Sequence, residues 1–189
     1  MNEQNIEQLL VNKLLNKEHK AWEEFYNLYS GKLGFICARY LSDQANVQDV
    51  LQEAIIKMYH GIGKFEFRGK GSLQAWATRI VVNEALGFIK ANSKINRVDE
   101  EILDTKAEEY NEPDLMYVSV DVILEMIQKL PLGYRTVFNL YVFEEKSHKE
   151  IGSLLGIEEN SSASQLYRAK QILGRKINEY KQIKNERHG

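Results

Sequence analysis

Residues 65–72 place aromatic, basic and glycine side chains together between two stretches with a helical pattern. The pair Gly69 and Lys70 suggests a phosphate-binding loop. That motif requires a glycine five residues before the pair and a serine or threonine directly after the lysine. This chain has Lys64 and Gly71 at those positions, so the phosphate cradle is not encoded and nucleotide hydrolysis is not expected.

The same segment has the groups that an unpaired nucleic acid base requires. Its rings can stack on a base, its cations can contact phosphates, and the amide of Asn83 offers two donors and an acceptor. Ser72 is expected to cap a helix over 72–91, whose polar face includes Arg79, Asn83, Gly87 and Lys90. The loop and this face together could therefore bind a single-stranded base. Without further context, a surface loop with buried aromatic residues is the better interpretation.

A second motif, near the C-terminus, is typical of a helix-turn-helix. Ser147 and Glu150 have the spacing of a capping box. Gly152 would permit a close helix crossing, Gly156 a left-handed turn, and Ile157 would fill the angle before the next helix. The alternative is a generic helical corner without a role in DNA binding.

The helix after this turn has two distinct faces. Leu166, Ala169 and Leu173 are expected to face inward, and the opposite face carries Ser164, Arg168, Gln171 and Arg175. In a major groove, Arg168 would be the best candidate for a bidentate contact to guanine, and Ser164 for a contact to a phosphate or base edge.

A third candidate surface lies on a helix predicted over 43–60. Its apolar stripe consists of Val47, Val50, Leu51, Ala54, Ile55 and Met58. Asp49, Gln52, Glu53 and Lys57 lie on the other side. Ile56 falls among these polar residues, and this arrangement predicts an apolar contact patch with an acidic rim. A single exposed apolar residue without a partner is the alternative.

These three segments belong to a chain whose pattern is helical throughout. The sequence has 189 residues, 43% of them hydrophobic, and only two prolines. Apolar residues recur at helical spacing, which predicts an all-α fold. The predicted helices span 3–16, 18–41, 43–60, 72–91, 114–129, 133–143, 147–155 and 160–184.

Charge divides the chain into two helical domains and a connector. Residues 92–118 carry three basic and eight acidic residues, whereas the flanking parts are nearly balanced. We predict an N-terminal helical bundle over 1–91, a flexible acidic linker over 92–113 and a C-terminal helix-turn-helix domain over 114–189. The end of the last helix is locally basic and could meet phosphates, although basic residues there also suit the helix dipole.

Several functional classes are not expected. Cys37 is the only cysteine, and the four histidines are scattered without zinc-ligand spacing, so neither an internal disulfide nor a metal site is predicted. Residues 1–6 lack the pattern of a secretion signal, and no apolar run reaches membrane-spanning length. We expect a cytoplasmic protein without membrane insertion, without a cofactor and without enzymatic activity.

Taken in order, the motifs resemble those of the extracytoplasmic-function sigma factors of the sigma-70 family, over most of the chain from about Ala21 to Leu173. Residues 46–54 resemble the helix of the family that binds polymerase. Residues 67–76 with Arg79, Ile80 and Asn83 resemble its promoter-melting segment. The C-terminal promoter-binding domain is matched by Leu130-Pro131, Val137-Phe138, the helix-turn-helix and residues 166–170.

The resemblance implies a partner or DNA element for each surface. Core RNA polymerase would be bound through Asp49, Gln52, Glu53 and Ile56. The minus-ten element of promoter DNA, with one base flipped out, would be held by Arg68, Lys70, Arg79 and Asn83. The minus-thirty-five element would be bound by Ser164, Gln165, Tyr167 and Arg168. The resemblance also implies an anti-sigma factor as a regulatory partner, and an acidic linker that threads toward the nucleic-acid channels of the polymerase.

The chain departs from the family at some of these positions. Many relatives carry basic residues where this chain has Ala163 and Gln165, and a basic or polar residue where it has Tyr141. Gln165 could contact an adenine instead, and the minus-thirty-five element could be recognised differently or more weakly. Asn46 and Gln48 replace acidic residues found near Asp49 in some relatives.

Three other functional classes explain less of the sequence. A stand-alone helix-turn-helix regulator would account for 119–189 but not for the N-terminal motifs. A helical enzyme would require a nucleophile and base, a metal set or a phosphate loop, and none is evident. A polymerase-binding decoy with a degraded DNA surface would fit Ala163 and Gln165.

Overall fold

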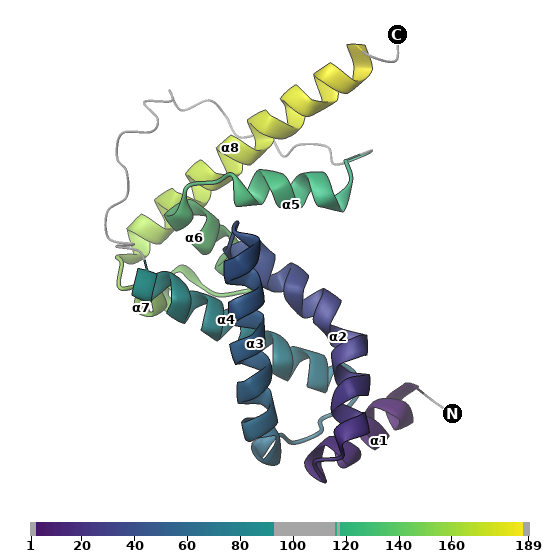
Figure 1. The fold of residues 1–189 in the computed structure, drawn as a ribbon. Coiled ribbons are helices and arrows are strands. Elements are labelled where there is room, and N and C mark those ends of the chain that lie inside the picture. Colours follow the sequence, from purple (N-terminus) through teal and green to yellow (C-terminus); the bar gives the residue numbers. More distant parts are fainter. Residues whose placement is uncertain (1–2, 93–115, 117, 187–189) are drawn as a thin grey trace. The chain divides into compact units, whose positions relative to one another are not determined.

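The computed structural model describes residues 3–92, 116 and 118–186, and the chain divides into two compact units, Met1–Asn92 and Ser93–Gly189 (Figure 1). Every regular element in the described part is a helix, which confirms the predicted all-α fold. Of the predicted linker over 92–113, only Asn92 lies within the described residues, where it ends a helix.

The first unit is a helical bundle. It contains α1 (Glu3–Leu15), α2 (His19–Tyr40), α3 (Gln44–Gly61), the short 3-10 helix η1 (Ile62–Lys64) and α4 (Ser72–Asn92). Helices α2, α3 and α4 pack against one another, and α1 packs against α2. The core side chains Phe25, Leu33, Met58 and Leu73 are almost completely buried. Each contributes about 1.5–3 kcal/mol relative to an exposed position, so the bundle forms a firm base for α3 and α4.

The second unit consists of α5 (Val120–Gln128), α6 (Leu132–Val142), α7 (His148–Leu155) and α8 (Glu159–Glu186). Helices α5, α6 and α8 share one buried cluster, formed by Met126, Ile127, Leu130, Tyr134, Ala169, Ile172, Leu173 and Ile177. Helix α7 packs against α6 and α8 and buries Ile151 completely. The position of α8 is therefore fixed by three other helices.

The predicted helix over 114–129 is wrong at its start. In the structure α5 begins at Val120, and Ser119 is its N-cap, with the hydroxyl accepting a hydrogen bond from the backbone N–H of Val122 at 3.4 Å. At the other end of α5, Arg135 donates to the carbonyl of Gln128 at 2.6 Å. The last carbonyls of a helix have no partner within the helix, and this side chain supplies one. Arg135 is buried, and burial lowers the pKa of its guanidinium.

Candidate nucleic-acid and protein interfaces

The first candidate surface is the exposed face of α3. The helix starts at an N-cap, Asp43, whose carboxylate accepts from the N–H of Asn46 at 2.9 Å. The predicted apolar stripe is confirmed, since Val47, Val50, Ala54 and Met58 are buried and Leu51 and Ile55 are half-buried. The stripe fixes the rotation of the helix, so the opposite face must point to solvent.

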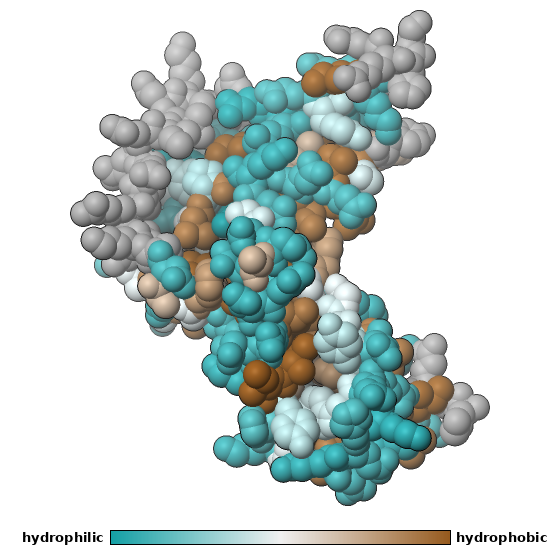
Figure 2. Space-filling model, viewed as in Figure 1, coloured by the Kyte–Doolittle hydropathy of each residue, from teal (hydrophilic) through white to brown (hydrophobic). Residues whose placement is uncertain are grey.

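That opposite face brings all four predicted residues together. Asp49, Gln52, Glu53 and Ile56 are each exposed, and Ile56 retains 43% of its surface. Gln52, Glu53 and Ile56 follow Asp49 by three, four and seven residues, which places all four on adjacent turns of one face. Figure 2 shows hydrophobic side chains exposed in the region of α3 within a mostly hydrophilic surface. Two carboxylates beside an aliphatic group suit a basic partner surface that also offers an apolar contact.

The second candidate surface begins in the loop between η1 and α4. Phe65 packs on Trp76 with ring centroids 5.2 Å apart, and both rings are half-buried. Arg68 and Lys70 are exposed. Arg68 forms an ion pair with Glu66 at 3.3 Å, but both side chains are about four-fifths exposed, so this pair contributes little. The aromatic residues anchor the loop while its cations face solvent.

Helix α4 continues this surface. Its apolar residues Leu73, Ala77 and Val81 are buried, and this leaves Arg79 and Asn83 exposed, as predicted. Glu84, the residue after Asn83, pairs with Lys57 of α3 at 2.7 Å. This ion pair joins the helix that carries the first surface to the helix that carries the second.

The prediction that Ser72 caps α4 is corrected by the structure. The hydroxyl of Ser72 accepts from the backbone N–H of Arg68 at 3.3 Å. The start of α4 is capped instead by Glu7 of α1, whose carboxylate accepts from the N–H groups of Gly71 at 2.6 Å and Leu73 at 2.9 Å. Sequence reasoning missed Glu7 because it lies more than sixty residues away along the chain.

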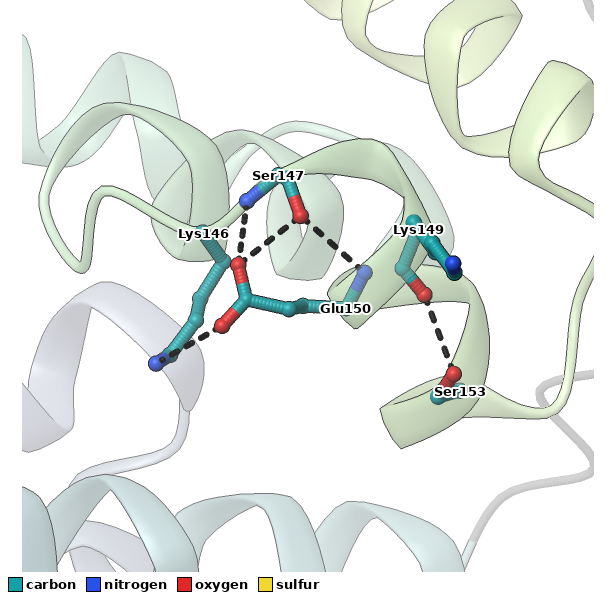
Figure 3. Close-up of polar contacts among 5 residues, drawn as sticks. All are labelled: Lys146, Ser147, Lys149, Glu150 and Ser153. Carbon is teal, nitrogen blue, oxygen red and sulfur yellow. Dashed lines mark hydrogen bonds and ion pairs between the residues drawn. The ribbon is translucent and has the colours of Figure 1, made fainter.

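The helix-turn-helix is formed by α7 and α8. The predicted capping box is confirmed: Ser147 accepts from the N–H of Glu150 at 3.3 Å, and Glu150 accepts from the N–H of Ser147 at 2.9 Å (Figure 3). Gly156 has the predicted left-handed conformation, and Ile157 is half-buried. The close approach at Gly152 is to the backbone of the turn at Ile157.

The capping box makes the second unit sensitive to acid. Hydrogen bonds from the backbone and hydroxyl of Ser147 lower the pKa of Glu150 below its usual 4.5, with a smaller contribution from Lys146. The ionised carboxylate therefore stabilises the fold above pH 4.5, and this contribution is lost as the pH falls through the lowered pKa. We expect Glu150→Gln to reduce the thermal midpoint by a few degrees at pH 7.

The measurement is thermal unfolding of both proteins between pH 7 and pH 3. The difference between them should shrink as the pH falls below 4.5 through the lowered pKa, because the native carboxylate then becomes protonated. Glu158→Gln, at an exposed carboxyl beside the turn, is the control and should show a smaller difference. A constant difference across the whole range would contradict the role of the carboxylate charge.

The third candidate surface is the outer face of α8. Ser164, Tyr167 and Arg168 are exposed, and Leu166, Ala169 and Leu173 are buried, as predicted. The guanidinium of Arg168 donates to the hydroxyl of Tyr134 at 3.1 Å. Because Tyr134 belongs to the buried cluster, its hydroxyl holds the guanidinium of this arginine in place.

The structure corrects the prediction that Gln165 contacts a base. It is only 7% exposed, and its amide oxygen lies 3.0 Å from the place that a Cβ on Gly133 would occupy. Position 165 follows Ser162 by three residues and precedes Ala169 by four, and both are fully buried. Gln165 therefore belongs to the inward stripe, and the helical spacing could have revealed this.

Sequence reasoning also missed a contact that joins three helices of this unit. Tyr141 of α6 stacks on His148 with ring centroids 4.7 Å apart. Nδ1 of His148, the first residue of α7, lies 3.0 Å from the hydroxyl of Ser162, which is fully buried in α8. Tyr141, one of the departures from the family pattern, therefore packs against the start of the helix-turn-helix.

The described residues offer contact surfaces without the groupings that metal chemistry requires. Among them, no cluster of three histidine, cysteine or acidic side chains could hold a metal ion. Likewise, none of their helices combines the length and apolar character needed to cross a membrane. Burial raises the pKa of the Cys37 thiol to about 11. A thiol with so high a pKa is a weak nucleophile at neutral pH.

Two family models match different parts of the chain. Residues 25–95 match sigma-70 region 2, and residues 121–173 match sigma-70 region 4. The chain is a sigma factor of the sigma-70 family. The match to region 2 also accounts for the N-terminal part, which a stand-alone helix-turn-helix regulator leaves unexplained.

Curated relatives place this sigma factor in the extracytoplasmic-function group. It is 27% identical to the ECF RNA polymerase sigma-E factor of Haemophilus influenzae, over 94% of this chain and 98% of the relative. It is 26% identical to the sigma-E factor of Escherichia coli K12, over 94% of this chain and 97% of the relative. As a member of this group it binds core RNA polymerase and directs promoter recognition and transcription initiation.

Among solved structures, the sigma factor is similar to RpoE of Bartonella quintana, which was crystallised with the anti-sigma factor NepR. The similarity covers 82% of this chain and 94% of the other, with 20% identity and a TM-score of 0.46.

Proposed function

We propose that the sigma factor divides its work among three surfaces. The bundle over 1–91 binds core polymerase through α3 and the minus-ten strand through the loop and α4. The domain over 114–189 binds the minus-thirty-five element through α8. The observation that carries this proposal is that each set of residues, except Gln165, is exposed. On α3, α4 and α8 a buried stripe sets the exposed face, and Arg68 and Lys70 are exposed in the loop before α4.

The minus-ten surface would stabilise an open strand by holding an extruded base. Unstacking one base costs a few kcal/mol, and a pocket that binds the base offsets this cost without ATP. Asn83 can pair with a base edge through its amide, and Arg68, Lys70 and Arg79 would neutralise nearby phosphates. All four are exposed and can reach a strand without rearrangement of the core.

The minus-thirty-five surface would depend on Arg168. A bidentate contact of arginine to guanine requires a fixed guanidinium plane, and the hydrogen bond to Tyr134 restricts that plane. Ser164 and Tyr167 are exposed on the same helix and would contact phosphates or base edges. Gln165 would support this face from the interior without touching a base.

Regulation and location follow from the group to which the chain belongs. We propose that an anti-sigma factor covers one or both DNA-binding surfaces and keeps the sigma factor silent. The linker over 92–113, acidic in sequence, would thread toward the nucleic-acid channels of the polymerase. Because its partners are core polymerase and chromosomal DNA, we place the protein in the cytoplasm, as a regulator without catalytic activity.

Transcription by purified core polymerase on genomic DNA, with and without the protein, would identify the promoter and supply the DNA for testing the three surfaces. Holoenzymes carrying Asn83→Ala or Lys70→Ala should bind the minus-ten single strand about five- to a hundredfold more weakly. Arg168→Ala and Tyr134→Phe should weaken binding of the minus-thirty-five duplex and leave binding of the minus-ten single strand unchanged.

Asn27→Ala and Lys129→Ala are controls. Asn27 is exposed on α2 and Lys129 is exposed at the C-cap of α5, and both lie outside the proposed surfaces. Uniform losses on both DNA probes would contradict the division of labour between the two domains.

A further inference from the structure

The contact between Glu7 and the start of α4 links the N-terminal helix to the proposed minus-ten surface. Glu7 projects from α1, which also lies against η1, the short helix that leads into the loop. Both of its carboxylate oxygens are used, one on Gly71 and one on Leu73. Hydrogen bonds to a charged acceptor are about twice as strong as neutral ones, and a carboxylate also suits the positive end of a helix dipole.

Local contacts close the turn within this loop. Ser72 donates its N–H to the carbonyl of Gly69 at 3.1 Å and accepts from Arg68, which closes a tight turn. Gly69 and Gly71 both have positive φ, 113° and 86°, in the region that favours glycine. A turn with glycine at these positions is flexible unless something outside it holds it. Glu7 holds this turn from outside, through the N–H groups of Gly71 and Leu73.

The surroundings of Glu7 keep its carboxylate in place. Burial raises the pKa of the Tyr29 phenol on α2, and the negative charge of Glu7 lies close enough to raise it further. Residues Leu10, Val11 and Leu14 of the same helix are buried, so α1 is anchored by its own apolar face. The carboxylate therefore projects from a fixed support.

We propose that Glu7 is a positioning residue for promoter opening: it holds the turn at 69–73 so that Arg68 and Lys70 are presented to the minus-ten strand. This rests on the proposed function of the loop. Glu7 touches the backbone of the turn and need not touch DNA. Helix α1 becomes part of the promoter-opening surface, although the match to region 2 begins only at residue 25.

The test compares holoenzymes carrying Glu7→Ala, Glu7→Gln and Asn83→Ala on three probes: the minus-ten single strand, the minus-thirty-five duplex and core polymerase itself. Glu7→Ala should weaken single-strand binding about five- to thirtyfold, with the other two affinities unchanged. Glu7→Gln keeps a hydrogen-bond acceptor without the charge, so its loss of single-strand affinity should be smaller than that of Glu7→Ala. Glu24→Ala, at an exposed carboxyl of α2, is the matched control.

Amide hydrogen exchange in the full chain supplies a second readout. The N–H groups of Gly71 and Leu73 should exchange faster in Glu7→Ala, while buried amides of α3 keep their protection, which a general loss of stability would not produce. If Glu7→Ala leaves single-strand binding unchanged while Asn83→Ala weakens it, the positioning role is wrong and the minus-ten assignment stands. If neither weakens it, both are wrong. Tighter binding by Glu7→Ala would show that the carboxylate competes with DNA phosphates, which also overturns the positioning role.

Discussion

Replacing both Asp49 and Glu53 by lysine is expected to weaken binding of core polymerase by at least a factor of about 100 and to abolish promoter-dependent transcription. Both carboxylates are exposed on one face of α3, in the segment that resembles the polymerase-binding helix of the family. Removing one partner of a charge pair that is desolvated in an interface costs about 2–5 kcal/mol of binding free energy. Reversing the charge adds repulsion between like charges.

The fold should survive this change, because neither side chain is buried and the stripe of Val47, Val50, Ala54 and Met58 is untouched. Titration of core polymerase with labelled protein measures the affinity, and thermal unfolding checks the fold. The control is the double reversal of Glu23 and Glu24, two exposed carboxyls of α2, which makes the same change in net charge. If the wild type and the variant with both Asp49 and Glu53 reversed bind core polymerase with equal affinity, this face of α3 is not part of the interface.

Helix positions could be predicted from the sequence wherever one buried stripe dominates. The boundaries of α1 to α4 and of α6 to α8 lie within one or two residues of the prediction. The start of α5 was wrong because the apolar residues before Ser119 suggested that the helical pattern extended further, whereas the hydroxyl of Ser119 begins the helix. A cap of this kind competes with helix continuation through local hydrogen bonds.

The two corrections at the candidate surfaces have different physical causes. Ser72 has the residue type and place of a helix cap, but a carboxylate from α1 occupies the N–H groups, and no local pattern encodes a contact across 64 residues. Gln165 was assigned to the DNA face from its polarity and from the family pattern. Its helical position places it in the core stripe with Ser162 and Ala169, so position rather than residue type decides its exposure.

The second large effect is expected from Gly152→Ala in α7. A Cβ at this position would lie 2.7 Å from the carbonyl oxygen of Ile157, closer than side-chain carbons approach other atoms. The obstacle is backbone, which cannot rotate away as a side-chain end can. The carbonyl of Gly152 also accepts from the N–H groups of Gly156 at 2.8 Å and Ile157 at 3.1 Å, so the turn is tied to this residue.

The variant should be destabilised by about 1–3 kcal/mol, the usual cost of overpacking. For a domain of this size that corresponds to a fall of roughly 5–20 °C in the thermal midpoint of the second unit. The shift of the turn would also displace the start of α8, so binding of the minus-thirty-five duplex should weaken. Core binding through α3 should be unchanged.

Gly133→Ala in α6 is the matched control. Its Cβ would meet the amide oxygen of Gln165 at 3.0 Å, and a side-chain end can move aside. In a helix, alanine is favoured over glycine by about 1 kcal/mol, so without the backbone clash Gly152→Ala would stabilise the unit. The sign of the change in thermal midpoint therefore decides the matter: a rise for Gly152→Ala would mean that α7 and the turn do not approach as closely as the structure shows.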